Sequence, residues 1–189
     1  GRPPAAMPGR GGRARAPPAA LSLKLHVGLV TPDAAVAEAR AAQNGMPASF
    51  AYARIIADAA DMLKDARLRA EALERTLGDA RAPADVPAQL WQTYVAAAQA
   101  AGNSAQLLQG DDDSWMAMAA GLSAADPVQG RAVYAYLAER GADAATRARA
   151  LSRLFASLAN SGLDMTAVRL FAAAPWGGEK LSLAAGTRA

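Results

Sequence analysis

The chain has 189 residues, 52% of them hydrophobic, and its formal net charge at pH 7 is +3. This length suits one domain or a short repeat array. The absence of cysteine and the presence of a single histidine, His26, exclude a disulfide framework, a cysteine-ligated metal and any site that needs two imidazoles. Because no run of about 18 apolar residues occurs, we expect no transmembrane helix.

The N-terminal residues 1–20 are rich in Pro, Gly, Arg and Ala, which predicts a disordered tail. Residues 1–31 contain no acid and the bases Arg2, Arg10, Arg13, Arg15 and Lys24, whereas the rest of the chain is nearly neutral. Such a segment is either a solvated linker or a binding element for an anionic polymer or membrane. The chain begins at Gly1 rather than Met, which indicates a processed chain or a piece of a longer one.

Residues 21–30 change character and alternate between apolar and polar or small side chains. The apolar positions recur every second residue, at Leu21, Leu23, Leu25, Val27 and Leu29. A period of two predicts a strand or an extended segment. Because a lone strand needs a partner edge and none is visible downstream, this segment either pairs outside the chain or packs against helices.

From Thr31 onward the apolar residues follow a helical period, so we predict an all-α protein. Residues 31–80 form the N-terminal helices, residues 85–174 form a second group, and residues 175–189 form a loose, Gly-rich tail. The predicted helices are 31–43, 46–64, 66–77, 87–101, 104–109, 112–124, 127–140, 143–160 and 164–174. Because most connections are short, neighbouring helices should be antiparallel hairpins.

Three of these helices share one pattern, with apolar residues at positions i, i+3, i+4 and i+7. The stripes are Trp91, Tyr94, Val95 and Ala98; Trp115, Met118, Ala119 and Leu122; and Leu151, Leu154, Phe155 and Leu158. The helices that follow carry Ala132 and Tyr136, and Ala167 and Phe171. Two helices per unit, at a period near 34 residues, are typical of tetratricopeptide arrays. We expect small residues, among them Ala98, Ala119, Ala132, Ala159 and Ala167, to let helix axes approach closely.

The segment 151–174 resembles a tetratricopeptide (TPR) repeat through Leu151, Leu154, Phe155, Leu158, Gly162, Ala167, Phe171 and Ala174. Residues 85–140 carry parts of the same pattern. The resemblance implies a short TPR-like α-solenoid that binds another protein or peptide on a helical surface. A compact helical bundle is the alternative interpretation of the same helices.

Few residues suggest chemistry. Asp111, Asp112 and Asp113 carry the oxygen ligands that a hard cation prefers, but they stand directly before a predicted helix, which favours helix capping. Pro8–Arg13 is glycine-rich without the strand and helix of a phosphate loop. We expect the His26 side chain to be exposed to solvent. We expect ordinary surface pairs among Glu71, Glu74, Arg67, Arg69 and Arg75, and no phosphate site among Arg147, Arg149 and Arg153.

Trp91 and Trp115 lie on the apolar stripes and should be core residues, whereas Trp176 either folds back on the last helix or contacts a partner. We therefore expect no catalytic, cofactor-binding or metal-binding residue, and nucleic acid is a poor candidate partner. The function predicted is a protein–protein interaction or assembly scaffold. The alternatives are a helical accessory region of a larger, for example cell-wall-acting, enzyme and anionic-polymer binding by the basic tail. The composition favours a bacterial source, with the cell envelope slightly preferred as compartment.

Overall fold

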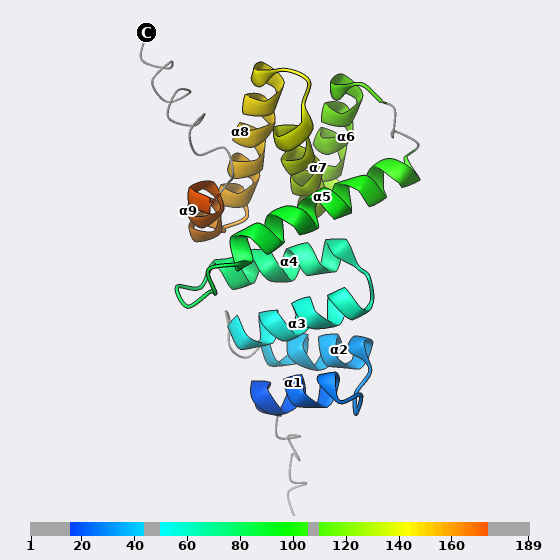
Figure 1. The fold of residues 1–189 in the computed structure, drawn as a ribbon, viewed down its shortest axis with the longest axis vertical. Coiled ribbons are helices and arrows are strands. Elements are labelled where there is room, and N and C mark those ends of the chain that lie inside the picture. The colour runs from blue at the N-terminus through cyan, green and yellow to red at the C-terminus, as the bar shows by residue number, and fades with distance from the viewer. Residues whose placement is uncertain (1–15, 44–49, 106–109, 174–189) are drawn as a thin grey trace, which may run out of the picture.

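The computed structural model describes residues 16–43, 50–105 and 110–173, and in these ranges all regular secondary structure is helical (Figure 1). The helices are α1 Pro18–His26, α2 Pro32–Gln43, α3 Phe50–Met62, α4 Ala66–Leu77, α5 Val86–Ser104, α6 Asp112–Ala125, α7 Pro127–Arg140, α8 Ala144–Asn160 and α9 Asp164–Ala173. None of the described helices combines the length and the hydropathy that crossing a membrane requires. The predicted all-α class is confirmed for this part of the chain.

Local sequence signals explain where four of the described helices begin. An aspartate precedes α4, α6, α7 and α8, and its carboxylate accepts a hydrogen bond from the backbone N–H of the residue three positions later. These N-caps are Asp65, Asp111, Asp126 and Asp143. Such caps satisfy N–H groups that have no partner within the helix. The predicted helices at 66–77 and 127–140 accordingly match α4 and α7 to the residue.

Most helices that follow one another in the chain also pack against one another, whereas α5 packs mainly against α4 and α7. Figure 1 shows α1 to α4 lying one above another across the long axis of the molecule. Helix α5 crosses the top of this stack obliquely, and α6, α7 and α8 run closer to the long axis on its other side. Helix α9 packs against α4, α5 and α8. The C-terminal helix therefore contacts both the first and the second group of helices predicted from the sequence.

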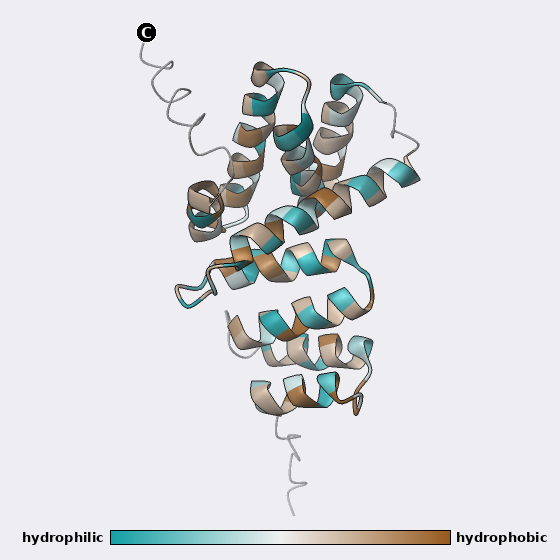
Figure 2. Ribbon diagram, in the orientation of Figure 1, coloured by the Kyte–Doolittle hydropathy of each residue, from teal (hydrophilic) through white to brown (hydrophobic). Residues whose placement is uncertain are grey.

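Figure 2 shows hydrophobic and hydrophilic residues alternating along the helices. A hydrophobic core cluster runs from Leu21 in α1 to Leu170 in α9. Small residues bring the helices close: a Cβ added at Gly102 in α5 would lie 2.2 Å from the Trp115 ring of α6. That ring stacks on Tyr136 of α7 with 4.6 Å between centroids. Glycine at position 102 thus makes room for the indole.

The predicted apolar stripes face the interior. All of their residues are buried or half-buried, and Trp91 and Trp115 are core residues as expected. The Phe155 ring meets the Phe171 ring edge-on, with 5.3 Å between centroids. The expectation for Ala159 is wrong, because this residue is exposed near the end of α8.

The prediction of an extended segment at 21–30 is also wrong. These residues form the end of α1 and a turn at 27–30. Residues two positions apart lie about 200° apart around a helix. An alternating sequence therefore puts apolar side chains on two opposite sides of α1. Leu21 and Leu25 face the core, whereas Leu23 and Val27 face outward. The helix forms its own backbone hydrogen bonds, so no partner strand is needed.

The predicted N-terminal tail must be shortened, because α1 begins at Pro18 and residues 18–20 are helical. Proline is tolerated at the first turn of a helix, where its missing N–H would have no partner. The helix predicted at 87–101 extends to Ser104, and the one predicted at 104–109 falls largely on 106–109, outside the described residues. Residues 1–15 and the tail 175–189, with Trp176, also lie outside them.

Candidate functional site

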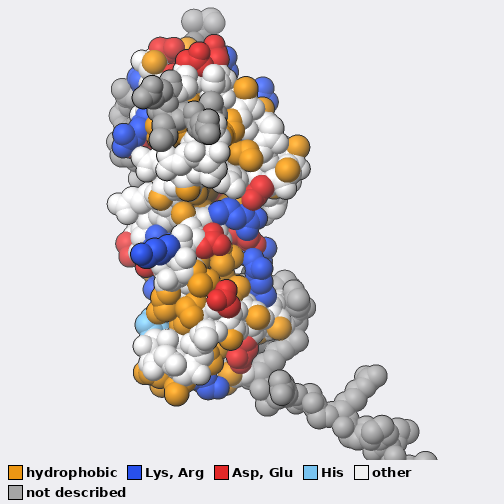
Figure 3. All heavy atoms as spheres, turned by 90° about the vertical axis from the view of Figure 1, so that its right-hand side faces the viewer, with side chains coloured by type: hydrophobic (Ala, Val, Ile, Leu, Met, Phe, Trp, Pro, Cys, Tyr) orange, Lys and Arg blue, Asp and Glu red, His pale blue; other side chains and the backbone are white. Residues whose placement is uncertain are grey.

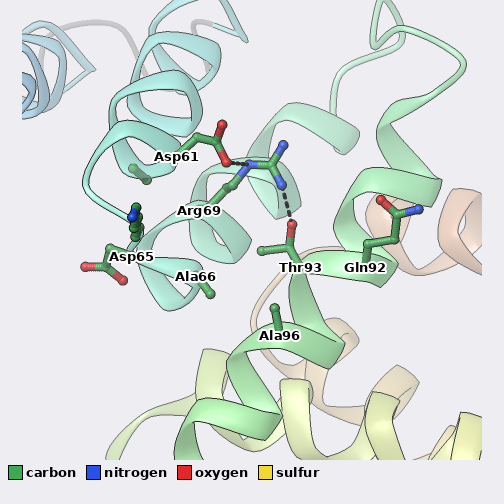
Figure 4. A pocket seen from close by; sticks show the side chains of 9 residues that line it. Asp61, Asp65, Ala66, Arg69, Gln92, Thr93 and Ala96 are labelled. Carbon is green, nitrogen blue, oxygen red and sulfur yellow. Dashed lines mark hydrogen bonds and ion pairs between the residues drawn. The ribbon is translucent and has the colours of Figure 1, made fainter.

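A cleft opens between the α3–α4 turn and α5 (Figure 4). Its volume is about 260 Å³, and we call it the α3–α5 cleft. The lining residues are Ala60, Asp61, Lys64, Asp65, Ala66, Arg69, Gln92, Thr93 and Ala96. Most of the charged and amide side chains among them are exposed, whereas Ala60 and Thr93 are buried. The cleft therefore has a packed helical floor and a hydrophilic rim.

Arg69 of α4 links the two sides of the cleft. Its Nε lies 3.5 Å from the Asp61 Oδ1 at the end of α3, and its Nη1 donates a 2.8 Å hydrogen bond to Thr93 Oγ1 in α5. Thr93 in turn donates to the backbone oxygen of Gln89, at 2.7 Å. Figure 4 shows the guanidinium held between Asp61 and Thr93. These contacts fix the Arg69 side chain in one place.

The rim carries further polar groups. Asp65 accepts the N-cap hydrogen bond from Leu68 N–H at 2.9 Å, and so its carboxylate is engaged with α4. Lys64 has a positive φ of 56°, which turns the chain between α3 and α4. Among the described residues, Lys64 forms no ion pair within 4.0 Å. The cleft thus offers an ammonium, the Gln92 amide and the Asp61 carboxylate to a polar ligand.

A buried ionic network lies beyond this cleft, between α4, α5 and α7. Arg131 of α7 binds Glu74 of α4 through two hydrogen bonds, Nε to Oε1 and Nη2 to Oε2, each 2.7 Å long. The Tyr94 hydroxyl of α5 donates to the same Oε1 at 2.5 Å. The side chains of Arg131 and Glu74 are only 3% and 2% exposed. We call these three residues the Glu74 network.

The surroundings shift the pKa values of Tyr94 and Arg131 in this network. Burial, together with the negative charge of Glu74, raises the pKa of Tyr94 well above its ordinary value. Burial opposes the charge of Arg131, but the hydrogen bonds and charge of Glu74 outweigh it and raise the pKa of Arg131. Tyr94 stays a neutral donor and Arg131 stays a cation. The network therefore holds a neutral Tyr94 hydroxyl and a cationic Arg131 against Glu74.

Further hydrogen bonds extend the Glu74 network to the last two helices. Arg131 Nη1 donates to the hydroxyls of Ser157 and Ser161, at 3.2 and 3.0 Å. Thr166 of α9 donates to the backbone oxygen of Glu74 at 2.7 Å. Arg169 of α9 donates to the backbone oxygens of Leu77, at 2.8 Å, and of Asp79. One set of polar contacts thus ties five helices together.

This network differs from the expectation for Glu74, which was an ordinary surface charge pair. Glu71 does fit that expectation: it binds Arg67 and Arg75 on its own helix, at 2.6 and 3.2 Å. The overlooked signal is position. Glu74 stands in a helical stripe with Ala70, Leu73 and Leu77, all buried, so its carboxylate must enter the core. A charged residue within an apolar stripe indicates a buried partner.

The acidic run and the histidine occupy separate places. Asp111 caps α6 through Ser114 N–H at 2.8 Å, which confirms the capping interpretation. The neighbouring Asp112 accepts from Ala142 N–H at 2.7 Å. His26 Nδ1 lies 2.8 Å from the backbone oxygen of Ser22 on its own helix, and its side chain is half exposed. In the part of the chain that the structure describes, no three His, Cys, Asp or Glu side chains form a metal-sized group.

The three arginines of α8 have different surroundings. Arg147 donates to the backbone oxygen of Gly141 at 2.9 Å. Arg149 lies 3.9 Å from the Asp113 carboxylate, and Arg153 is exposed. Arg147 and Arg149 thus have different partners. The glycine-rich stretch 8–13 lies outside the described residues.

The chain was compared with protein-family models, with curated proteins and with solved structures, and none of them matches it. The TPR resemblance thus stays a prediction from the repeat spacing, and the function must be argued from the geometry of the chain.

Proposed function

We propose that this chain is a non-catalytic protein–protein interaction or assembly module. It stacks antiparallel helical hairpins as a short TPR-like α-solenoid and binds a partner segment in the α3–α5 cleft. Two features of the helices support the solenoid. Helices α2, α3, α4 and α5 pack in chain order, as do α6, α7 and α8, and three helices repeat one apolar stripe. Arrays of this kind present extended surfaces that bind other chains.

The composition of the cleft rim is the observation that carries the proposal. Lys64 supplies an ammonium with three donors, Gln92 both a donor and an acceptor, and Asp61 a carboxylate acceptor. An extended peptide presents the complementary groups in its backbone amides and in an acidic side chain. Because Arg69 is fixed by Thr93, the floor of the cleft is already ordered before binding, which lowers the entropy cost of association.

The test is selection of peptides from a displayed library against the full 189-residue chain, followed by measurement of Kd. The cleft variant is Lys64→Asn with Gln92→Ala. Asparagine tolerates the positive φ at position 64, so the variant removes the ammonium and the amide without straining the turn. Arg153→Ala is the matched control, because this residue is exposed on α8.

We expect the selected peptides to contain an acidic residue and to bind the cleft variant about tenfold more weakly, a loss of about 1.4 kcal/mol. The Arg153→Ala control should bind with unchanged Kd. Selection of no peptide at all, or equal binding by the cleft variant and the wild type, would overturn the proposal.

A further inference from the structure

Helix α1 has an apolar side that no described part of the chain covers. Leu21 and Leu25 fill the core, but Leu23 and Val27, on the opposite side of the helix, are 63% and 57% exposed. Leu29 follows in the turn after the helix and is 75% exposed. We call Leu23, Val27 and Leu29 the outer face of α1. Figure 3 shows hydrophobic side chains, with a basic one beside them, at the lower end of the molecule, where α1 lies in Figure 1.

The charges along this segment have one sign. Lys24 lies beside Leu23 in α1 and is exposed. Residues 1–31 contain four arginines besides Lys24 and no acid, and the first acid in the chain is Asp33. The carboxylate of Asp58 in α3 lies 4.0 Å from His26 Nε2. The outer face of α1 therefore belongs to a segment that is both apolar and cationic.

A second exposed apolar pair provides a contrast. Met165 and Val168 of α9 are 51% and 61% exposed. The cation next to them, Arg169, already binds the backbone oxygens of Leu77 and Asp79. The α9 pair thus has apolar exposure without an available cationic neighbour, and it can serve as a control.

We propose that the outer face of α1 binds the surface of an anionic lipid bilayer. The three apolar side chains would enter the boundary between headgroups and acyl chains, while Lys24 faces the phosphates. The positive charge of residues 1–31 adds attraction to an anionic surface. Apolar insertion combined with attraction between basic residues and anionic lipid is the way in which interfacial segments hold to membranes. This site is separate from the α3–α5 cleft and does not depend on the proposed function.

A lipid surface fits the outer face of α1 better than a second copy of the chain. A stable protein interface buries about 800 Å² on each partner, far more than three side chains on and beside a nine-residue helix provide. A symmetric dimer through this face would also bring two basic segments together, and like charges repel. An anionic bilayer removes both difficulties, because it neutralises the bases and accepts a small apolar patch.

The experiment is co-sedimentation of the full 189-residue chain with vesicles. One set contains phosphatidylserine in phosphatidylcholine, and the other contains phosphatidylcholine alone. The test variant is Leu23→Ser, Val27→Ser and Leu29→Ser together, and Leu29→Ser alone changes only the turn outside α1. The control is Met165→Ser with Val168→Ser. Far-ultraviolet circular dichroism verifies that each variant keeps its helices.

We expect the wild type to bind the anionic vesicles and to bind the neutral ones at least about tenfold more weakly. The triple variant should lose about tenfold in affinity for anionic vesicles, Leu29→Ser should lose severalfold, and the α9 control should bind like the wild type. Failure of the wild type to bind would overturn the proposal. So would equal binding by the triple variant, which would assign the attraction to the basic residues alone. Light scattering that shows a dimer, lost in the triple variant and without vesicle binding, would assign the face to a second copy.

Discussion

Substitution of Glu74 by Gln is the most direct test of the Glu74 network. The change keeps the shape of the side chain but removes the charge that neutralises Arg131. The Arg131 side chain is only 3% exposed, and its guanidinium would then have two serine hydroxyls and a neutral amide around it in place of the carboxylate. Removing one partner of a buried ion pair costs about 3–5 kcal/mol, because the other charge is left in the core without compensation. We therefore expect a loss of this size in the free energy of unfolding.

The assay is urea unfolding followed by circular dichroism, with thermal melting in parallel. For a chain of this size the loss corresponds to a decrease in Tm of about 6–20 °C. Asp113→Asn is the control: its carboxylate is 93% exposed and lies 3.9 Å from Arg149, so its removal should cost about 0.5 kcal/mol or less.

A second variant separates the charge effect from general damage. Glu74→Leu, Arg131→Met and Tyr94→Phe together replace the network by apolar side chains and leave no unpaired charge. The Ser157 and Ser161 hydroxyls lose the donor Arg131. Such replacements are often neutral or stabilising. The triple variant should therefore be more stable than Glu74→Gln. If Glu74→Gln costs less than about 1 kcal/mol, or if the triple variant is no more stable than it, the assignment of a buried ion pair is wrong.

Three further outcomes are expected. Gly102→Ala should destabilise the chain by about 1–3 kcal/mol because its methyl group meets the Trp115 ring, whereas Gly121→Ala in α6, with open space around it, should gain up to about 1 kcal/mol in the same urea assay. Phe155→Ala should cost about 2 kcal/mol, less than a fully buried ring, and Arg153→Ala about 0.5 kcal/mol or less; equal effects would contradict the stripe on α8. Burial opposes the ionisation of Asp126, but the hydrogen bond from Arg67 outweighs it and lowers the pKa of Asp126. The ionised Asp126 therefore stabilises the fold above about pH 4, and this contribution is lost as the pH falls through the lowered pKa. Asp126→Asn keeps the cap but removes the titrating carboxyl. The free energy of unfolding should therefore fall less steeply with decreasing pH in this variant than in the wild type, and an equal slope would refute this assignment.

The sequence alone predicts the helical class and most helix boundaries, because the signals involved are local. Asp65, Asp126 and Asp143 cap the helices that begin after them, and a cap needs only the next three residues. The apolar stripes on α5, α6 and α8 were likewise read from spacing and point inward as predicted. The capping role of Asp111 follows from the same local chemistry.

The tertiary structure decided what depends on partners distant in the chain. Alternation at 21–30 is compatible with a strand or with a helix that has two apolar sides, and only packing against α2 and α3 selects the helix α1. Glu74 and Arg131 are 57 residues apart, and no local sequence pattern around either residue indicates its partner. The α3–α5 cleft likewise requires Arg69 of α4 to reach Thr93 of α5. Helix formation is governed by nearby residues, whereas burial, ion pairing and clefts are decided by which helices lie side by side.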